Sequence, residues 1–364
     1  MNKNKGWRFT GNERKYLDEV LDNGFGASES GSMNERLEKK FAKIHDMKYA
    51  ISANSGTSTL HMALNAFGVG PGDEVIIPAL SVAMCGFSVW QCGAIPVFAD
   101  SLSNTFLLDP DDVDKKISKK TKAIMPVHMF GGMCDMKQIV EIAEKNSLYV
   151  LEDSAQCFLA TDEKGRKSGT IGDIGSWSFE NSKHLSTGDG GIVLTNNEEL
   201  ATKMRQFGGV GYKNINAESG KVRISRDKFQ DPDWKRFNIM AYNYRMPEIC
   251  AAVGLAQCER FEEFVELRIK MADSYLEILK ENNDLLIPAD IPNGYKNSYY
   301  TFPARFIGEN NGVHWQDFRK KYIEFGGDGI YATLQVLYNE PAFYENKIGY
   351  GKAPIAEKLQ KELM

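Results

Sequence analysis

Residues 49–67 have the sequence YAISANSGTSTLHMALNAF, in which a short apolar run leads through a Ser-Gly-Thr turn into an apolar helical pattern. The same alternation of short apolar runs and helical segments recurs from about residue 49 to residue 195. The runs are Tyr49–Ala53, Glu74–Pro78, Ile95–Ala99, Lys122–Val127, Leu148–Glu152, Gly175–Phe179 and Ile192–Thr195. The helical segments among them are Thr57–Phe67, Ser81–Cys92, Asp135–Asn146 and Glu198–Phe207. Short runs buried on both faces and joined by helices predict an α/β domain with a mostly parallel sheet.

The rest of the chain predicts a second, smaller domain. Residues 208–237 are rich in Gly, Asn and charged side chains and lack a clear period, which indicates a long surface excursion. The elements predicted after it are a helix from Pro247 to Lys280, a strand at Tyr299–Phe306 and a helix at Trp315–Phe325. We therefore predict a large domain at residues 1–245 and a small α+β domain at residues 246–364. Because Met364 falls within a helical pattern, we expect the protein to continue beyond it.

The composition argues against several classes of protein. The 364 residues include 44 Lys and Arg against 49 Asp and Glu, a net charge of −5, which disfavours a general nucleic-acid or anionic-membrane binder. No apolar run approaches the roughly 18 residues of a membrane span, and the N-terminus lacks the apolar stretch of a secretory signal. The six cysteines form no Cys-x-x-Cys pair, so neither a disulfide framework nor a structural zinc is expected. We expect a cytoplasmic protein that binds no nucleic acid, membrane or metal.

Three groups of polar residues lie at the predicted C-terminal ends of strands, where ligands bind in open α/β sheets. The first, Ser55-Gly56-Thr57-Ser58, opens a helix directly after a strand. Free amides and the positive end of the helix dipole can bind a phosphate there, although Ser and Thr also cap helices that bind nothing. The second, Glu152-Asp153-Ser154-Ala155-Gln156, follows the apolar Leu148–Leu151. Its carboxylates could hold a cationic ring nitrogen or a metal, or cap the next helix.

The third group is Ser178-Phe179-Glu180-Asn181-Ser182-Lys183-His184, which precedes the turn Gly188-Asp189-Gly190-Gly191. Most lysines are surface charges, but Lys183 lies between a strand end and a glycine-rich turn rather than on a solvated helix face. A lysine near other cations or an apolar wall can form Schiff bases. A phosphate seat, an acid for a ring nitrogen and a lysine for an aldehyde are together what pyridoxal 5′-phosphate (PLP) requires.

In these features the chain resembles the DegT/DnrJ/EryC1/StrS family of sugar aminotransferases, which are PLP enzymes of fold type I. Besides the three groups above, the matching stretches are Gly72–Pro78, Val127-His128-Met129-Phe130-Gly131, Gly172-Asp173-Ile174-Gly175 and Tyr242-Asn243-Tyr244-Arg245-Met246. Their order and spacing hold from about residue 10 to residue 260. The resemblance implies a large domain with a mostly parallel seven-stranded sheet flanked by helices, followed by the smaller α+β domain.

The resemblance also implies a role for each matched residue. Lys183 would carry PLP covalently as a Schiff base and move protons between substrate and cofactor. Asp153 would pair with the pyridinium nitrogen, so that the ring acts as an electron sink, and Gln156 would lie against the ring and its phenolic oxygen. The residues that would hold the phosphate are Gly56, Thr57 and Ser178 from the same chain and Asn243 from the neighbouring subunit. A homodimer with two shared active sites is therefore implied.

Two positions depart from the family pattern. Family members often have Thr and an aromatic residue where this chain has Ser81-Val82, so an aliphatic face or another ring must serve the cofactor there. The glycine-rich turn has Asp189 where Glu is usual. In one branch of the family histidine replaces the lysine and the enzyme is a dehydratase. Lys183 therefore favours transamination, and the adjacent His184 is expected to have no catalytic role.

The implied function is transfer of an amino group, with glutamate as donor, to a keto-sugar that we expect to be nucleotide-linked. Such a reaction serves cell-surface polysaccharide or secondary-metabolite sugar biosynthesis. Arg236 and Arg245 flank the Asn243 motif and are candidates for binding a substrate phosphate or carboxylate, although a solvated loop would also contain such cations. The alternatives are an aminotransferase of a free sugar acid or cyclitol, a PLP-dependent sugar dehydratase, and a non-catalytic cofactor-binding regulator. The regulator is disfavoured because binding alone does not require a proton-transfer lysine.

Overall fold

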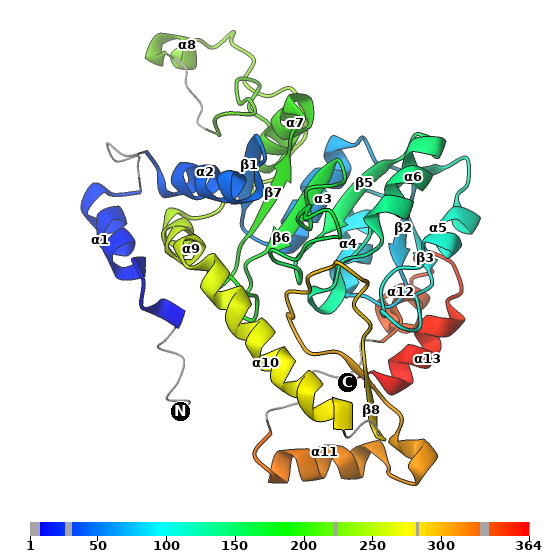
Figure 1. The fold of residues 1–364 in the computed structure, drawn as a ribbon. Coiled ribbons are helices and arrows are strands. Elements are labelled where there is room, and N and C mark those ends of the chain that lie inside the picture. The colour runs from blue at the N-terminus through cyan, green and yellow to red at the C-terminus, as the bar shows by residue number, and fades with distance from the viewer. Residues whose placement is uncertain (1–7, 26–30, 221–224, 282–283, 328–334, 364) are drawn as a thin grey trace.

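The computed structural model describes residues 8–25, 31–220, 225–281, 284–327 and 335–363. At its centre the described residues form a seven-stranded sheet with the order β1-β7-β6-β5-β4-β2-β3 (Figure 1). The strands are β1 (Tyr49–Ala53), β2 (Glu74–Pro78), β3 (Ile95–Ala99), β4 (Thr121–Ile124), β5 (Tyr149–Asp153), β6 (Ile174–Ser178) and β7 (Gly191–Thr195). Strands β3, β2, β4, β5 and β6 pair in parallel, whereas β7 is antiparallel to both β6 and β1. The prediction of a mostly parallel seven-stranded sheet is confirmed.

Helices cover the sheet and enclose two buried clusters. The helices of the N-terminal part are α1 (Glu13–Asn23), α2 (Met33–His45), α3 (Gly56–Ala66), α4 (Ala83–Gln91), α5 (Pro110–Lys116), α6 (Met136–Asn146) and α7 (Glu198–Gly208). Alternate residues of β7 enter different clusters: Ile192 and Leu194 pack with α1 and α2, whereas Val193 packs with α3 and α7. Because successive side chains of a strand point to opposite faces, the sheet is buried on both sides at this end.

Short polar residues fix where several of these helices begin. The Ser55 hydroxyl accepts the amide N–H of Ser58 at the start of α3, and Asp135 accepts that of Gln138 at the start of α6. Asn197 caps α7 in the same way. Each cap satisfies an amide that the helix cannot pair by itself and so sets the position at which the chain leaves the sheet.

The excursion at residues 208–237 contains one short helix, α8 (Arg226–Gln230), and otherwise no regular element among its described residues. The single helix predicted from Pro247 to Lys280 is two helices, α9 (Glu248–Glu259) and α10 (Phe261–Glu281). The chain leaves helical geometry at Arg260, where φ is −116°. The start of α10, at Phe261 and Val265, still packs with α9 in the cluster that contains α1 and α2, and the rest of α10 continues outward, away from the sheet (Figure 1). Pro247 precedes α9 in extended geometry instead of forming its first turn.

The strand predicted at Tyr299–Phe306 is shorter in the structure. Only Ala304–Phe306 (β9) pairs, and its antiparallel partner is β8 (Leu286–Pro288). Residues ahead of it turn back to the large sheet, because the amide of Ser298 donates to the carbonyl of Gly131 (2.9 Å). Gly131 has φ +98°, and a Cβ there would lie 2.3 Å from the amide nitrogen of Tyr299, so only glycine permits this close approach.

The last described residues return to the large sheet. The elements beyond β9 are a 3₁₀ turn at Gly308–Asn311, α11 (Trp315–Glu324), a 3₁₀ turn at Leu337–Asn339, α12 (Pro341–Tyr344) and α13 (Pro354–Glu362). Leu337 and Phe343 are buried in the same cluster as β2 and β3, and the carbonyl of Tyr350 accepts the amide of Phe98 at the β3 edge (2.8 Å). Residues after 246 therefore form the small sheet and also cover the edge of the large one.

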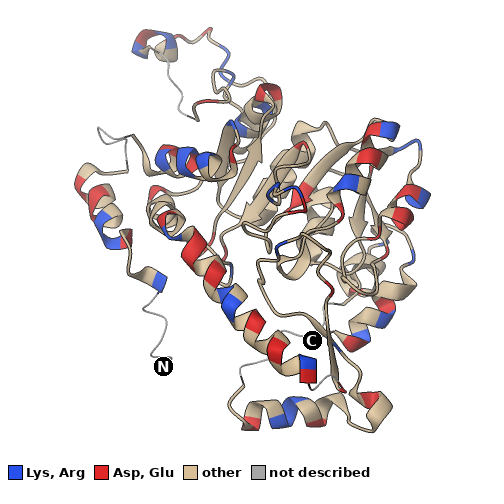
Figure 2. Cartoon of the chain, viewed as in Figure 1, with Lys and Arg blue, Asp and Glu red and all other residues tan. Residues whose placement is uncertain are grey.

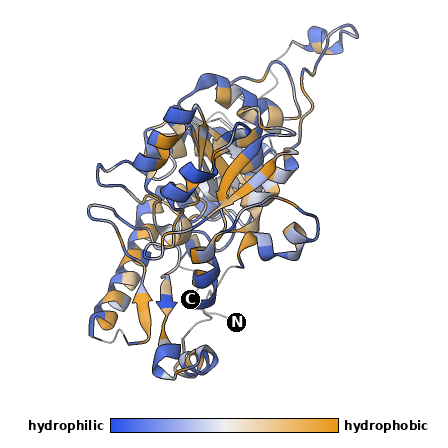
Figure 3. Ribbon diagram, turned by 90° about the vertical axis from the view of Figure 1, so that its right-hand side faces the viewer, coloured by the Kyte–Doolittle hydropathy of each residue, from blue (hydrophilic) through white to orange (hydrophobic). Residues whose placement is uncertain are grey.

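Charge and hydropathy follow these layers. Acidic and basic side chains alternate along α10 and the other outer helices, while the strands carry few charges (Figure 2). Strands of the large sheet are mostly hydrophobic and the helices around them present hydrophilic residues outward (Figure 3). Within the described part of the chain, no helix is long and apolar enough to cross a membrane.

Candidate active site

The candidate site lies where β5 and β6 end and α3 begins. Asp153 is the last residue of β5, Ser178 is the last residue of β6, and Gly56 is the first residue of α3. Since β5 and β6 are parallel neighbours, their carboxyl ends meet at one edge of the sheet. This is the edge at which open α/β sheets bind ligands.

Gly56, Thr57 and Ser178 form a tight corner suited to an anion. A Cβ on Gly56 would lie only 2.6 Å from the Cβ of Ser178, so the helix start and the strand end are in direct contact. The Ser55 hydroxyl occupies the amide of Ser58 (3.1 Å), which makes Ser55 a helix cap. The first-turn amides of Gly56 and Thr57 have no partner within the helix, and they form the positive end of its dipole.

Asp153 is a buried carboxylate with two fixed oxygens. Asp153 is only 2% exposed. Oδ1 accepts the amide of Ala155 (3.0 Å), and Oδ2 accepts the thiol of Cys85 (3.3 Å). Burial raises the pKa of Asp153 above its ordinary value, and the amide, the thiol and the charge of Lys183 act against this rise. A cationic ring N–H would stabilise the ionised carboxylate in this setting.

The side chain of Glu152, which the sequence left as a candidate to hold a ring nitrogen or a metal, faces away from the Asp153 carboxylate. Its buried oxygens accept the amides of Gly169, Ile171 and Gly172 at 2.8, 2.7 and 2.6 Å. His128 Nε2 donates to the same carboxylate (2.9 Å). Because His128 Nδ1 accepts the amide of Cys134 (3.1 Å), the imidazole is neutral with its proton on Nε2.

The pair of Glu152 and His128 supports the end of β5. The amide of His128 donates to the carbonyl of Asp153 (2.9 Å), which fixes the backbone from which the Asp153 carboxylate extends. Sequence reasoning placed His128 in a matched motif but gave it no role. Its hydrogen bonds join Glu152 to the backbone of Asp153.

Gln156 supplies an unused donor. Its Oε1 accepts the amide of Phe130 (2.9 Å), which fixes the side chain. Its Nε2 is buried and has no hydrogen-bond partner among the described residues. A buried amide N–H without a partner is costly, so this group is suited to donate to an oxygen of a bound molecule. The Ser81 hydroxyl, by contrast, already contacts the sulfurs of Cys85 (3.5 Å) and Met129 (3.9 Å).

Lys183 lies on the loop between β6 and β7. Its side chain is half-buried, and Nζ lies 4.4 Å from the centroid of the Tyr300 ring. The next residue, His184, is buried, and its Nε2 donates to the carbonyl of Ser298 (2.8 Å). Burial, with Arg268 and Arg8 nearby, lowers the pKa of His184 to about 3, so its ring is neutral. This arrangement gives His184 a structural role.

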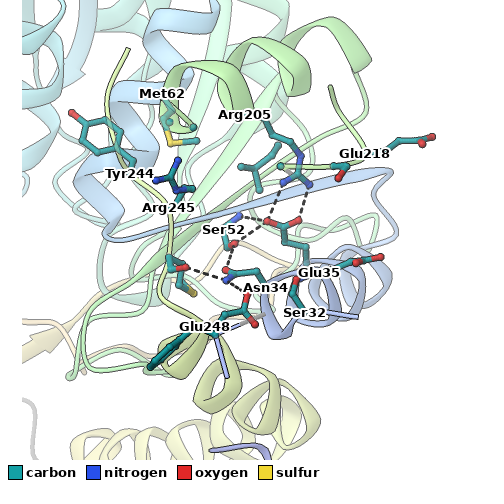
Figure 4. Close-up of a pocket in the computed structure, with 18 residues that line it drawn as sticks. Ser32, Asn34, Glu35, Ser52, Met62, Arg205, Glu218, Tyr244, Arg245 and Glu248 are labelled. Carbon is teal, nitrogen blue, oxygen red and sulfur yellow. Dashed lines mark hydrogen bonds and ion pairs between the residues drawn. The ribbon is translucent and has the colours of Figure 1, made fainter. Parts of the chain in front are cut away.

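Three candidate residues lie apart from this cluster within one chain. Asn243 is exposed and pairs through its backbone with Gly209. Arg236 donates to the carbonyls of Phe229 (2.6 Å) and Trp234 (3.2 Å) inside the excursion. Arg245 lines a separate pocket of about 340 Å³ (Figure 4).

That pocket is walled by charged residues from several elements. Its lining includes Glu35 and Glu38 from α2, Arg205 from α7, and Glu248 from α9 (Figure 4). Arg205 is paired with Glu38 (2.6 Å), which also accepts the hydroxyl of Ser52 (2.8 Å). Glu38 and Arg205 therefore neutralise each other within the wall, whereas Arg245 is exposed.

The donor set at the sheet edge fits PLP. A buried carboxylate, an unpartnered amide donor, two free helix amides and a lysine converge there, and these groups match the ring nitrogen, phenolic oxygen, phosphate and aldehyde of that cofactor. Fold and site together define an enzyme of the fold-type-I PLP class.

The chain belongs to the DegT/DnrJ/EryC1/StrS aminotransferase family, whose model matches residues 8–364. It is 35% identical to a GDP-perosamine synthase of Escherichia coli O157:H7 over 96% of this chain and 88% of that protein. It is 42% identical to a GDP-perosamine synthase of Caulobacter vibrioides over 74% of this chain and 67% of that protein. The X-ray structure of an aminotransferase from Psychrobacter cryohalolentis superposes with a TM-score of 0.85 at 29% identity, covering 96% of this chain and 90% of that one.

Some residues of the site carry no signal in the sequence. Tyr300, Arg8 and Arg268 contact Lys183 or its loop from segments far along the chain. Their types are common on any surface, and no motif marks them. Cys85 could be recognised only as an apolar position of α4, although its thiol contacts Asp153.

Proposed function

We propose that this protein is a PLP-dependent aminotransferase that moves an amino group from glutamate to a nucleotide-linked keto-sugar in the cytoplasm. The observation that carries the proposal is the convergence of Asp153, Gln156 and Lys183 beside the anion corner at Gly56. When bound, PLP supplies an electron sink for the carbon that gains or loses the amine. The chain's own residues supply the binding, the proton transfer and the orientation.

Each residue has a task that follows from its surroundings. Lys183 Nζ would form the covalent link to the cofactor aldehyde and then carry protons at the reacting carbon. Asp153 would keep the ring nitrogen protonated, since its carboxylate is buried and a cationic N–H would stabilise its ionised form. The Gln156 amide would donate to the phenolic oxygen. Gly56, Thr57 and Ser178 would bind the phosphate.

The family relatives support the substrate class. Both reported relatives are named GDP-perosamine synthases, so a GDP-linked keto-sugar is the first substrate to test. A lysine at position 183 supports transamination over dehydration, as the sequence indicated. A product of this kind would serve cell-surface polysaccharide or secondary-metabolite sugar biosynthesis.

A homodimer with shared sites is part of the proposal. Large apolar side chains are exposed around Asn243, and Met240 is 93% exposed. Exposed apolar stretches mark interaction surfaces, and here the stretch is continuous with the residue expected to reach a neighbour's phosphate. Arg236 and Arg245 would act on the substrate from the same segment. A mass of one chain by light scattering would contradict this part.

The test follows the two half-reactions separately. The purified protein is loaded with PLP and mixed with glutamate, and 2-oxoglutarate is measured; about one equivalent per bound cofactor is expected. A GDP-linked keto-sugar is then added and the aminated sugar is detected. Lys183→Ala should abolish both steps, while Lys164→Ala, an exposed lysine, should not. No 2-oxoglutarate from glutamate, together with a deoxy sugar formed without any donor, would favour the dehydratase instead.

A further inference from the structure

The loop that carries Lys183 has little regular structure to hold it. Residues 180–184 belong to neither helix nor β-ladder beyond a single bridge at Glu180. Inside the loop, the amide of Lys183 donates to the carbonyl of Glu180 (3.0 Å). The Glu180 carboxylate accepts the amide of Ser182 (3.0 Å). These local bonds leave the carbonyls of the loop to be satisfied from outside it.

Arg8, from the N-terminal segment, binds three of those carbonyls. Its Nη1 donates to the carbonyl of Asn181 (2.9 Å), and its Nη2 donates to those of Lys183 and His184 (3.1 Å for the latter). The segment is itself anchored, because the carbonyl of Arg8 accepts the side-chain amide of Gln257 on α9 (2.7 Å). The guanidinium therefore joins the loop to a buried helix.

Arg268, from α10, binds the remaining carbonyl of the stretch. Its Nη2 donates to the carbonyl of Ser182 (3.1 Å), and its Nη1 donates to that of Tyr300. The Tyr300 hydroxyl and the Ser182 hydroxyl are bonded to each other (2.6 Å). The Tyr300 ring lies over Lys183 Nζ at 4.4 Å. Four consecutive carbonyls, at residues 181–184, thus accept from two arginines.

We propose that Arg8 and Arg268 are positioning residues that hold the backbone of residues 181–184 so that Lys183 Nζ meets the cofactor aldehyde. This inference rests on the proposed function. A planar guanidinium bonded to several carbonyls fixes a chain path, which a single ammonium group cannot do. In the step concerned, the Nζ lone pair attacks the aldehyde carbon and a C=N bond forms. The aldehyde oxygen leaves as water with the two protons of the amine. The ring of Tyr300, in contact with Nζ, also restricts the positions that Nζ can occupy.

The test separates the covalent link from the rest of cofactor binding. Dissociation constants are measured for PLP and for pyridoxine 5′-phosphate, which has the same ring and phosphate but an alcohol in place of the aldehyde. The variants are Arg8→Ala and Arg268→Ala. Their matched controls are Arg14→Ala near the first and Lys270→Ala on the same helix as the second, both exposed positions.

The two arginine variants should bind pyridoxine 5′-phosphate within about twofold of the wild-type protein, because the phosphate corner and Asp153 are untouched. They should bind PLP about tenfold or more weakly, since charge-assisted hydrogen bonds that place the lysine are lost. The controls should match the wild type for both ligands. Arg268→Lys keeps the positive charge but loses the guanidinium that bonds two carbonyls, so it should also bind PLP more weakly than the wild type. This variant replaces Arg268→Ala in the test if Arg268→Ala does not fold.

The outcomes are distinguishable. Equal affinity of the wild-type protein for the two ligands would contradict the proposed function itself. A wild-type preference for PLP that both arginine variants retain would overturn the positioning role. An equal loss of affinity for both ligands in the variants would also overturn it, because the arginines would then support the whole site and not the lysine.

Discussion

The contact between Gly56 and Ser178 gives the most quantitative prediction for the anion corner. In Gly56→Ala, the added Cβ would lie 2.6 Å from the Cβ of Ser178 and 3.2 Å from its Cα. Carbon atoms in contact normally lie about 3.5–4.0 Å apart, so the helix start must move by about 1 Å. Overpacking of this kind costs about 1–3 kcal/mol. The same movement displaces the Ser178 hydroxyl and the first-turn amides relative to one another.

The change should be measured on the apo-protein and on its complex with PLP. For a chain of 364 residues, an unfolding entropy of about 2 cal/mol/K per residue converts the expected cost into a Tm lower by about 1–4 °C. PLP affinity should fall by about tenfold, because bonds to the phosphate are charge-assisted. Gly70→Ala is the matched control, since a Cβ there meets nothing within 4 Å and its φ is not left-handed.

A second variant isolates the cause. In Gly56→Ala combined with Ser178→Gly, the closest contact is removed, so the apo-protein should recover part of the lost Tm while PLP affinity stays low without the hydroxyl. If Gly56→Ala has the same Tm as Gly70→Ala and binds PLP with wild-type affinity, the close contact does not have the predicted effect.

Three further predictions concern buried titratable groups. Because burial raises the pKa of Asp153, ionising this group lowers the stability of the apo-protein as pH rises above about 4, the ordinary carboxyl range. Apo Asp153→Asn should therefore have a higher Tm than the wild type at about pH 7. The difference in Tm should disappear near about pH 3 when melting curves are measured as a function of pH. Burial lowers the pKa of His45 to about 4 and that of His184 to about 3, so between about pH 6.5 and pH 4 only the unfolded state takes up their protons. The free energy of unfolding, measured with urea, should therefore fall by about 2 kcal/mol per histidine between pH 7 and pH 5. His45→Gln should make this fall with pH less steep. Cys85→Val removes a donor to Asp153 and should weaken PLP binding in an equilibrium titration, whereas Cys85→Ser, a better donor, should preserve it; equal binding by both variants would contradict a role for the thiol.

The strands of the large sheet were predictable because burial on both faces leaves continuous apolar runs. β1, β2 and β3 begin and end at the predicted residues. β4 stops earlier than predicted, at Ile124, because Pro126 has no amide to continue the ladder and the chain turns there toward Asp153. The direction of β7 carries no signal in its own residues. It is explained by the loop before it, which lacks a crossover helix.

Beyond the sheet, prediction failed where distant contacts decide the structure. Continuous helical periodicity predicted one helix through Arg260, but the chain leaves helical geometry there. Phe261 and Val265 at the start of α10 still pack in the cluster with α1 and α2. The β-propensity of residues 299–303 is overridden by the bond from Ser298 to Gly131 and by Pro303.

The site divides in the same way. Asp153, Ser178 and Gly56 were identified because strand ends and helix starts are local features of the sequence. Arg8 and Arg268 lie 175 and 86 positions from their loop partners Lys183 and Ser182, and no local pattern connects such residues. When an arginine binds backbone carbonyls, the sequence cannot indicate which ones, since every residue has a carbonyl.

The proposed function requires a covalent bond between Lys183 and the cofactor, and borohydride trapping shows whether that bond forms. The protein is mixed with PLP, reduced with borohydride, digested and examined by peptide mass spectrometry. We expect a reduced PLP adduct on Lys183 and no adduct when pyridoxine 5′-phosphate replaces PLP. An adduct on another lysine, or none on Lys183 at saturating PLP, would contradict it.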